Sequence, residues 1–206
     1  MSKKEIFLHP FTPLYGQTEL TNDDKNGLKL TDLKTKFDVY NAEAENISKA
    51  SNHFLGQILS NHEILDDLWL RQLHKLMFED VWEWAGKYRQ RDTNIGIDPA
   101  YIQVDLRKLC DDAKVWLEYN TYSITEIIIR FHHLLLKIHP FPDGNGRWAR
   151  MACMCLANAN SLKIDWSKVS TEENKLQYVA ALKHADYYAD YQKLISLMAP
   201  LFQEEF

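Results

Sequence analysis

The feature that most constrains the fold of this chain is how rarely glycine and proline interrupt it. The sequence has 206 residues with only 7 Gly and 6 Pro, and the long stretches between them carry apolar residues at intervals of three and four. That spacing is the period of an α-helix. We therefore expect a mostly α-helical fold, in a chain long enough to bury a substantial core without disulfides or a structural metal.

The pattern divides the chain into an irregular arm over residues 1–30, an N-terminal helical segment over 31–62 and a larger helical body over 63–206. Within these parts the spacing predicts helices over 31–59, 65–81, 106–119, 127–138 and 145–158. Between residues 87 and 104 the helical period fails, and turn-forming residues alternate with residues of high strand propensity. We predict a short β-hairpin there.

Composition and charge exclude several classes of protein. The net charge is -5, so there is no general basic field and direct nucleic-acid binding is not expected. Cys110, Cys153 and Cys155 fit neither a disulfide framework nor zinc spacing, which favours a reducing, cytoplasmic location. The chain also shows no signal-peptide core and no apolar run long enough to span a membrane, so no membrane association is expected.

One segment of twelve residues, from His139 to Arg150, combines polar chemistry that core packing does not explain. Gly144 and Gly146 allow the backbone angles at which successive N–H groups converge on an anion, and the helix that follows directs its positive end toward the same point. Arg147 and Arg150 lie three residues apart, where both guanidinium groups can grip phosphate oxygens. The segment predicts a phosphate-binding site.

Two further residues of this segment supply chemistry beside the phosphates. Asp143 offers a hard oxygen ligand, the kind that holds Mg²⁺ next to substrate phosphates. His139, with an ordinary pKa near ~6.5, accepts a proton at neutral pH and is the natural general base.

The run His-Pro-Phe-x-Asp-Gly-Asn-Gly-Arg-x-x-Arg resembles the active-site motif of the Fic (filamentation induced by cAMP) family. Most members of that family transfer AMP from ATP to a hydroxyl side chain of a target protein. The resemblance implies a Fic-type helical bundle with a flap near the active site, and it makes residues 63–206 the catalytic core and C-terminal helices. It also implies ATP as co-substrate and Mg²⁺ or Mn²⁺ as cofactor.

By that resemblance, His139 would deprotonate a Ser, Thr or Tyr hydroxyl of the target, and Asp143 would hold the metal at the α- and β-phosphates. The anion hole would be formed by Gly144, Asn145 and Gly146. Arg147 and Arg150 would hold the departing pyrophosphate, and Phe141 would anchor the loop in the core. The predicted hairpin would be the flap, whose turn would clamp the target backbone as an added strand; that turn comprises Thr93, Asn94, Ile95 and Gly96.

A second resemblance lies in the N-terminal helical segment. Many Fic proteins carry an inhibitory helix with Ser or Thr, three residues, Glu, then Gly or Asn, whose Glu pairs with the second motif arginine. The run from Asn41 to Asn46 resembles it with Asn in the first position. This predicts Glu45 as an inhibitory glutamate paired with Arg150, and Asn41 as its partner in the motif. The helix ending also resembles the Fic subgroup named mobile mystery protein B.

Alternatives stay open at this level. One is phosphate transfer from ATP, as in the Doc branch of the family, although the loop sequence of that branch resembles Ala-Asn-Lys-Arg, whereas this chain has Gly144 and Gly146 there. Removal of AMP from a modified protein is another, with Glu45 positioning water. A third is a non-enzymatic, nucleotide-binding toxin–antitoxin module. The sequence leaves the target protein, a homo-oligomer and a separate regulatory protein undecided.

Overall fold

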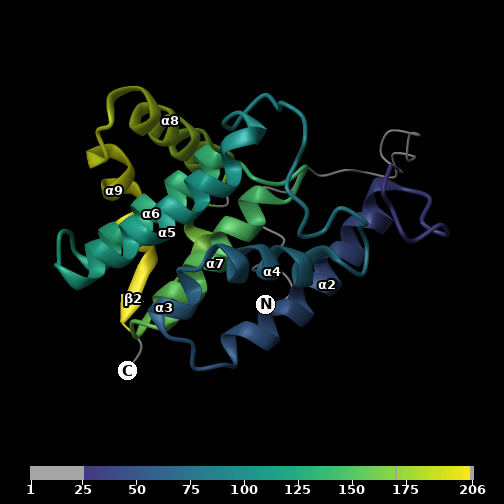
Figure 1. The fold of residues 1–206 in the computed structure, drawn as a ribbon, viewed down its shortest axis with the longest axis horizontal. Helices are drawn as coiled ribbons and strands as arrows, with labels where there is room; N and C mark the ends of the chain where they lie inside the picture. Colours follow the sequence, from purple (N-terminus) through teal and green to yellow (C-terminus); the bar gives the residue numbers. More distant parts are fainter. Residues whose placement is uncertain (1–25, 170, 205–206) are drawn as a thin grey trace.

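The structure is a computed structural model that describes residues 26–169 and 171–204, and it is mostly helical as expected (Figure 1). Most of the arm predicted for residues 1–30 lies outside the described residues. The helices are α2 (Lys36–Leu55), α3 (Asn61–Ile64), α4 (Asp67–Phe78), α5 (Ile102–Glu118), α6 (Ile124–Ile138), α7 (Asn145–Asn158), α8 (Glu172–Tyr188) and α9 (Gln192–Met198), with short 3₁₀ turns at Pro99–Tyr101, Trp166–Val169 and Ala199–Leu201.

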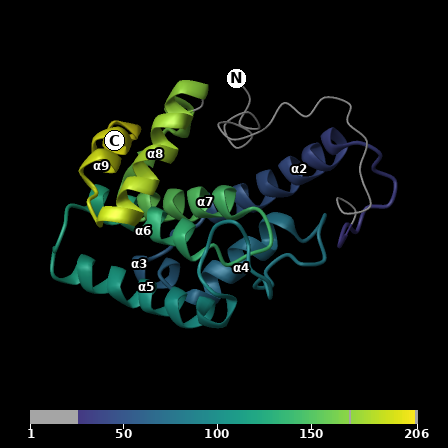
Figure 2. The same cartoon turned by 90° about the horizontal axis from the view of Figure 1, so that it is seen from above.

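Helices α6 and α7 form the centre of the molecule and pack against each other (Figures 1 and 2). Helix α5 covers α6, α2 and α4 pack on each other and on α7, and α8 and α9 close the other end. Helix α6 is apolar on almost every side, as a central helix must be. The loop between α6 and α7 therefore lies between two helices that the core holds fixed.

The starts of α2 and α6 follow from local chemistry. Thr35 caps α2, with its side chain accepting from the Asp38 N–H at 3.2 Å while the Asp38 carboxylate accepts from the Thr35 N–H at 2.9 Å. Ser123 caps α6 by accepting from the Glu126 N–H at 3.2 Å. Such caps satisfy amide groups that have no partner within the helix.

The predicted β-hairpin over residues 87–104 is wrong in its secondary structure. Residues 87–98 form bends and irregular backbone without strand pairing, and Pro99 begins a 3₁₀ turn that leads into α5. Asp98 caps this turn by accepting from the Ala100 N–H at 2.9 Å. Ile102, expected on a strand, is instead a buried residue of the first turn of α5, so burial in the core outweighed its strand propensity.

The two strands of the described chain lie elsewhere. β1 (Leu162–Ile164) pairs antiparallel with β2 (Phe202–Glu204), with Lys163 opposite Gln203. Each strand has three residues, too few to show an alternating pattern in the sequence. The strand pair places the segment that follows α7 beside the last described residues.

Cys110, Cys153 and Cys155 are buried free thiols. Across residues 26–169 and 171–204, none of the helices has the length and apolar character needed to cross a membrane.

Candidate active site

The loop from His139 to Gly144 is shaped by two residues with left-handed backbones. His139 ends α6 with φ 51° and ψ 61°, and its N–H donates to the Leu135 carbonyl at 3.1 Å. Gly144 begins α7 with φ 77°. A Cβ at Gly144 would lie 2.6 Å from Cζ of Phe78, so glycine is required there for both conformation and space.

Asn145 and Phe141 fasten this loop to itself and to the core. The Asn145 side chain accepts from the Phe141 N–H at 3.0 Å and donates to the Phe141 carbonyl at 2.8 Å. Phe141 is fully buried, stacks on His74 with ring centroids 3.6 Å apart and meets Trp148 edge-on. The side chain of Asn145 is thus occupied in holding the loop, and it is the backbone of residues 144–146 that is left to face an anion at the start of α7.

His74 is a structural residue of the site that the sequence reasoning missed. It is completely buried on α4, and its Nδ1 accepts from the Gly86 N–H at 3.0 Å. Its Nε2 must therefore carry the proton, which it donates to the Asp143 carbonyl at 3.1 Å. Burial lowers the pKa of His74 to about 3, so the ring is neutral at pH 7.

His139 is half-buried at the mouth of the loop. Burial is the main cause that lowers its pKa, and the nearby positive charge of Arg89 acts in the same direction, while the carboxylate of Asp143 opposes them. The neutral ring is therefore the favoured form at pH 7. A neutral imidazole is the form that accepts a proton from an attacking hydroxyl.

The two predicted arginines both lie at the first turns of α7. Arg147 lies 4.9 Å above the ring of Phe78, and its Nη2 is 3.6 Å from Oδ2 of Asp143. Arg150 is 8% exposed, and its Nη1 would be 3.8 Å from a Cβ at Gly146. Burial lowers the pKa of Arg150 to about 10, so it remains a cation at neutral pH. Two cations thus lie beside the amino end of one helix.

The carboxylate that pairs with Arg147 is Glu43, and the predicted pair of Glu45 with Arg150 does not form. Glu43 is 5% exposed, with Oε2 2.5 Å from Nη1 of Arg147 and Oε1 accepting from the Trp82 indole N–H at 2.7 Å. Glu45 and its supposed motif partner Asn41 are exposed, and both line a surface pocket with Asp38. An exposed carboxylate on that surface cannot pair with the buried Arg150.

The reason is the rotation of α2. Residues two apart on an α-helix point about 200° away from each other, so Glu43 and Glu45 cannot share a face. On this helix Phe37 is 54% exposed, whereas Val39 is buried. A stripe through Val39, Glu43 and Ile47, one helical turn apart each time, would have identified Glu43 from the sequence.

Asp143 is the candidate metal ligand, and its environment fits that role. The residue is exposed at the mouth of the loop, and its side chain is 69% accessible. No group of three His, Cys, Asp or Glu able to hold a metal occurs within the described part of the chain. A single accessible carboxylate suits Mg²⁺ that also takes oxygens from substrate phosphates and water.

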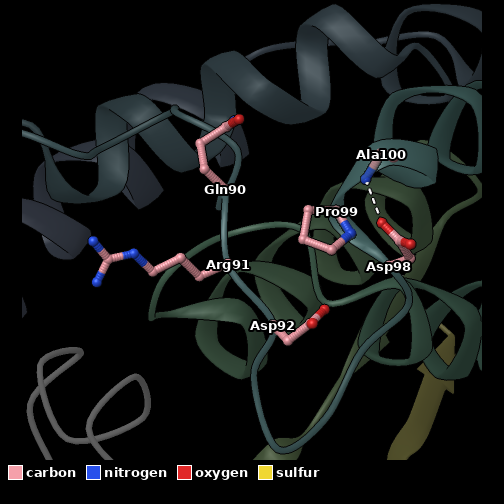
Figure 3. Close-up of a pocket in the computed structure, with 6 residues that line it drawn as sticks. All are labelled: Gln90, Arg91, Asp92, Asp98, Pro99 and Ala100. Atoms are coloured by element: carbon pink, nitrogen blue, oxygen red, sulfur yellow. Dashed lines mark hydrogen bonds between the residues drawn. The ribbon is translucent and has the colours of Figure 1, made fainter.

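The flap residues lie beside this site in an open loop. Thr93, Asn94, Ile95 and Gly96 are all exposed, with Ile95 63% exposed. Figure 3 shows the two limbs of the loop, with Gln90, Arg91 and Asp92 on one and Asp98, Pro99 and Ala100 on the other. These six residues line one pocket, and the Arg91 side chain extends away from Asp98.

Comparison with known proteins identifies a family and a fold. Residues 64–157 match the Fic/DOC family. The protein adenylyltransferase VbhT of Bartonella schoenbuchensis is 30% identical over 122 residues, covering 50% of this chain and 23% of that protein. An Escherichia coli protein named as a probable protein adenylyltransferase Fic is 28% identical over 114 residues, covering 50% and 55%. The match thus spans 23% of the length of the first relative and 55% of the length of the second.

A solved structure resembles the fold over most of both chains. The N-terminal Fic domain of a VirB-translocated Bep effector protein from Bartonella quintana, solved with bound ADP, aligns with a TM-score of 0.68 at 22% identity. The alignment covers 85% of this chain and 89% of that one. The helical arrangement of Figure 1 is therefore that of a Fic domain.

Proposed function

This chain contains a domain of the Fic/DOC family over residues 64–157, and from that premise we propose that it is a protein adenylyltransferase. It would transfer AMP from ATP to a Ser, Thr or Tyr hydroxyl of another protein. The observation that carries the proposal is the grouping between α6 and α7: a half-buried His139 whose pKa is lowered by burial, a helix start at Gly144 and two arginines on the first turns of that helix. Relatives named as protein adenylyltransferases support it.

The reaction needs little covalent chemistry from the protein. His139 takes the proton of the target hydroxyl, whose oxygen forms a bond to the α-phosphorus. The bond from that phosphorus to the bridging oxygen breaks, and pyrophosphate leaves. The N–H groups at the start of α7, with Arg147 and Arg150, stabilise the charge on the phosphates. Asp143 would hold Mg²⁺ or Mn²⁺, which neutralises phosphate charge when bound.

Regulation by a carboxylate belongs to the same proposal, with Glu43 in place of Glu45. The ion pair between Glu43 and Arg147 occupies a guanidinium that the proposed reaction needs for phosphate. Glu43 also accepts from Trp82, so this carboxylate is held in position rather than free to swing away. Because a bound triphosphate and Glu43 would compete for one cation, we expect the resting protein to have low activity.

The test uses ATP labelled on the α-phosphate in one series and on the γ-phosphate in another. Wild-type protein, Glu43→Gln and the matched control Glu45→Gln are incubated with Mg²⁺ and a cell lysate. The glutamine at position 43 keeps the size of the side chain but removes its charge. We expect α-label on lysate proteins to rise at least tenfold in Glu43→Gln and to stay at the wild-type level in Glu45→Gln.

Other results would redirect the assignment. Transfer of γ-label alone would mean phosphotransfer of the Doc type. Loss of α-label from pre-modified protein, faster with wild type than with Glu43→Gln, would mean AMP removal. ADP binding without transfer of either label under any condition would favour a non-enzymatic module.

A further inference from the structure

Arg89 is a buried cation that none of the roles above uses. It lies at the base of the flap and is 3% exposed. None of the ion pairs recorded among residues 26–169 and 171–204 involves it. A buried charge is costly unless its donors are satisfied, so its hydrogen bonds show what it is for.

The guanidinium of Arg89 donates only to backbone carbonyls, and these belong to two different parts of the site. Nε donates to the His139 carbonyl at 2.7 Å, and Nη2 reaches the Ile138 carbonyl at 3.4 Å. Nη1 donates to the Arg91 carbonyl at 3.0 Å, and Nη2 also donates to the Ile97 carbonyl. One group thus joins both limbs of the flap to the last carbonyls of α6.

The surroundings are shaped around this group. The Arg89 N–H donates to the Pro140 carbonyl at 2.9 Å, and the Ile97 N–H approaches the Ile138 carbonyl at 3.5 Å. Gly96 has φ 119°, and a Cβ there would lie 2.6 Å from Nη2 of Arg89 and 2.9 Å from Cβ of His139. The end of α6 presents carbonyls without helical partners and the negative end of the helix dipole, which both favour a cation.

We propose that Arg89 is a positioning residue that ties the flap to the backbone of His139, so that the docking surface and the general base keep one fixed relation. Arginine suits this task because its planar fork carries five N–H donors in a rigid geometry, which lysine lacks. The part of the proposal that concerns target docking rests on the adenylyltransferase assignment. The tie, by which we mean the hydrogen bonds from Arg89 to the flap and to the end of α6, does not depend on that assignment.

The experiment compares Arg89→Lys, Arg89→Gln and the control Lys87→Gln. Lys87 is exposed in the same segment, so its variant loses one positive charge without touching the tie. Amide hydrogen exchange is measured on each full-length chain without nucleotide or target. We expect exchange at residues 90–98 and 138–141 to rise at least tenfold in both Arg89 variants, with α2 and α8 unchanged and with Lys87→Gln like wild type.

A second readout separates positioning from general stability. The ring of His139 is titrated by NMR in the same chains; the charged groups facing it are Arg89 from the flap and Asp143 from its own loop. We expect its pKa to rise in Arg89→Gln and to stay near the wild-type value in Arg89→Lys, which keeps the charge. Both readouts work in a protein that transfers nothing, so failure of the proposed function would not obscure them.

Unchanged exchange in the flap of a folded Arg89 variant would overturn the proposal. Global unfolding of both Arg89→Lys and Arg89→Gln would also overturn it, because the role proposed is local. If the adenylyltransferase assignment holds, Arg89→Lys should further raise KM for the target while leaving KM for ATP unchanged.

Discussion

The loop of residues 139–144 and the flap of residues 90–98 meet at Arg89 but are built in opposite ways. The loop is fixed by buried groups: Phe141 in the core, the paired hydrogen bonds of Asn145 and the ring of His74. The flap exposes every residue from Arg91 to Gly96. The difference fits the proposed function, in which the phosphate chemistry would depend on a rigid backbone while the exposed flap would be completed by a target protein.

The largest effect we expect concerns two buried histidines, His74 beneath the loop and His132 on α6, and it appears as the pH falls. Burial lowers the pKa of both His74 and His132 to about 3, from 6.5. Both rings are neutral in the folded chain but take up protons in the unfolded chain below pH 6.5. The free energy of unfolding is therefore highest above about pH 6.5. It decreases as the pH falls toward 3, by about 1.4 kcal/mol per pH unit for each ring.

Urea unfolding at pH 7, 6 and 5 measures this slope. His74→Gln should flatten it, since one of the two titrating groups is gone. A free energy of unfolding that does not change between pH 7 and pH 5 would mean that the ring under the loop is not the neutral donor we describe.

The next largest effect concerns the start of α7. Gly144→Ala should lower the free energy of unfolding by about 2–4 kcal/mol, because alanine is strained at positive φ and its Cβ would overlap Phe78. Gly146→Ala is the matched control for stability, since the nearest atom to its Cβ is 3.8 Å away. Chemical denaturation checks both, and equal costs at the two glycines would contradict a loop fixed by close packing.

In the flap we expect a loss of function without a loss of stability. Asn94→Pro removes one backbone N–H from the exposed segment, and by the strand-addition proposal it should lower kcat/KM for the target about tenfold. ADP binding, measured by calorimetry, should not change. An equal fall in ADP affinity would show that the flap shapes the phosphate site itself and would remove the contrast between the two regions.

The smallest effect is expected from Ile95→Ala. This side chain is 63% exposed, so its truncation should change the free energy of unfolding by less than about 0.5 kcal/mol. A thermal melt suffices to measure it. A cost above 1 kcal/mol would mean that the flap packs against the body in solution.

The arrangement of the loop could be predicted because its signals are local. Two glycines, a helix start and two arginines within twelve residues predict a phosphate site without knowledge of the rest of the chain; the structure places these residues together, and phosphate binding stays a prediction. The helix predicted over 127–138 is confirmed as α6, which begins three residues earlier, and the helix predicted over 145–158 is confirmed to the residue. Their apolar pattern and the prolines between them are again local signals.

What the sequence could not provide depends on contacts between distant residues. The choice of Glu43 over Glu45 depends on which face of α2 meets α4 and α7. The role of His74 depends on Asp143, 69 positions later in the chain. The strands β1 and β2 have three residues each, and they form because two segments far apart in the sequence pair with each other. A single histidine or a three-residue strand carries no pattern by which it could be recognised.

The most direct test of the central claim compares Glu43→Gln with the double variant Glu43→Gln/His139→Ala in transfer from α-labelled ATP. Both chains are first shown by calorimetry to bind ADP alike. The account predicts strong labelling of target protein by the single variant and a loss of at least a hundredfold in the double variant. Equal labelling by the two chains would contradict the assignment of His139 as the general base and, with it, the proposed function.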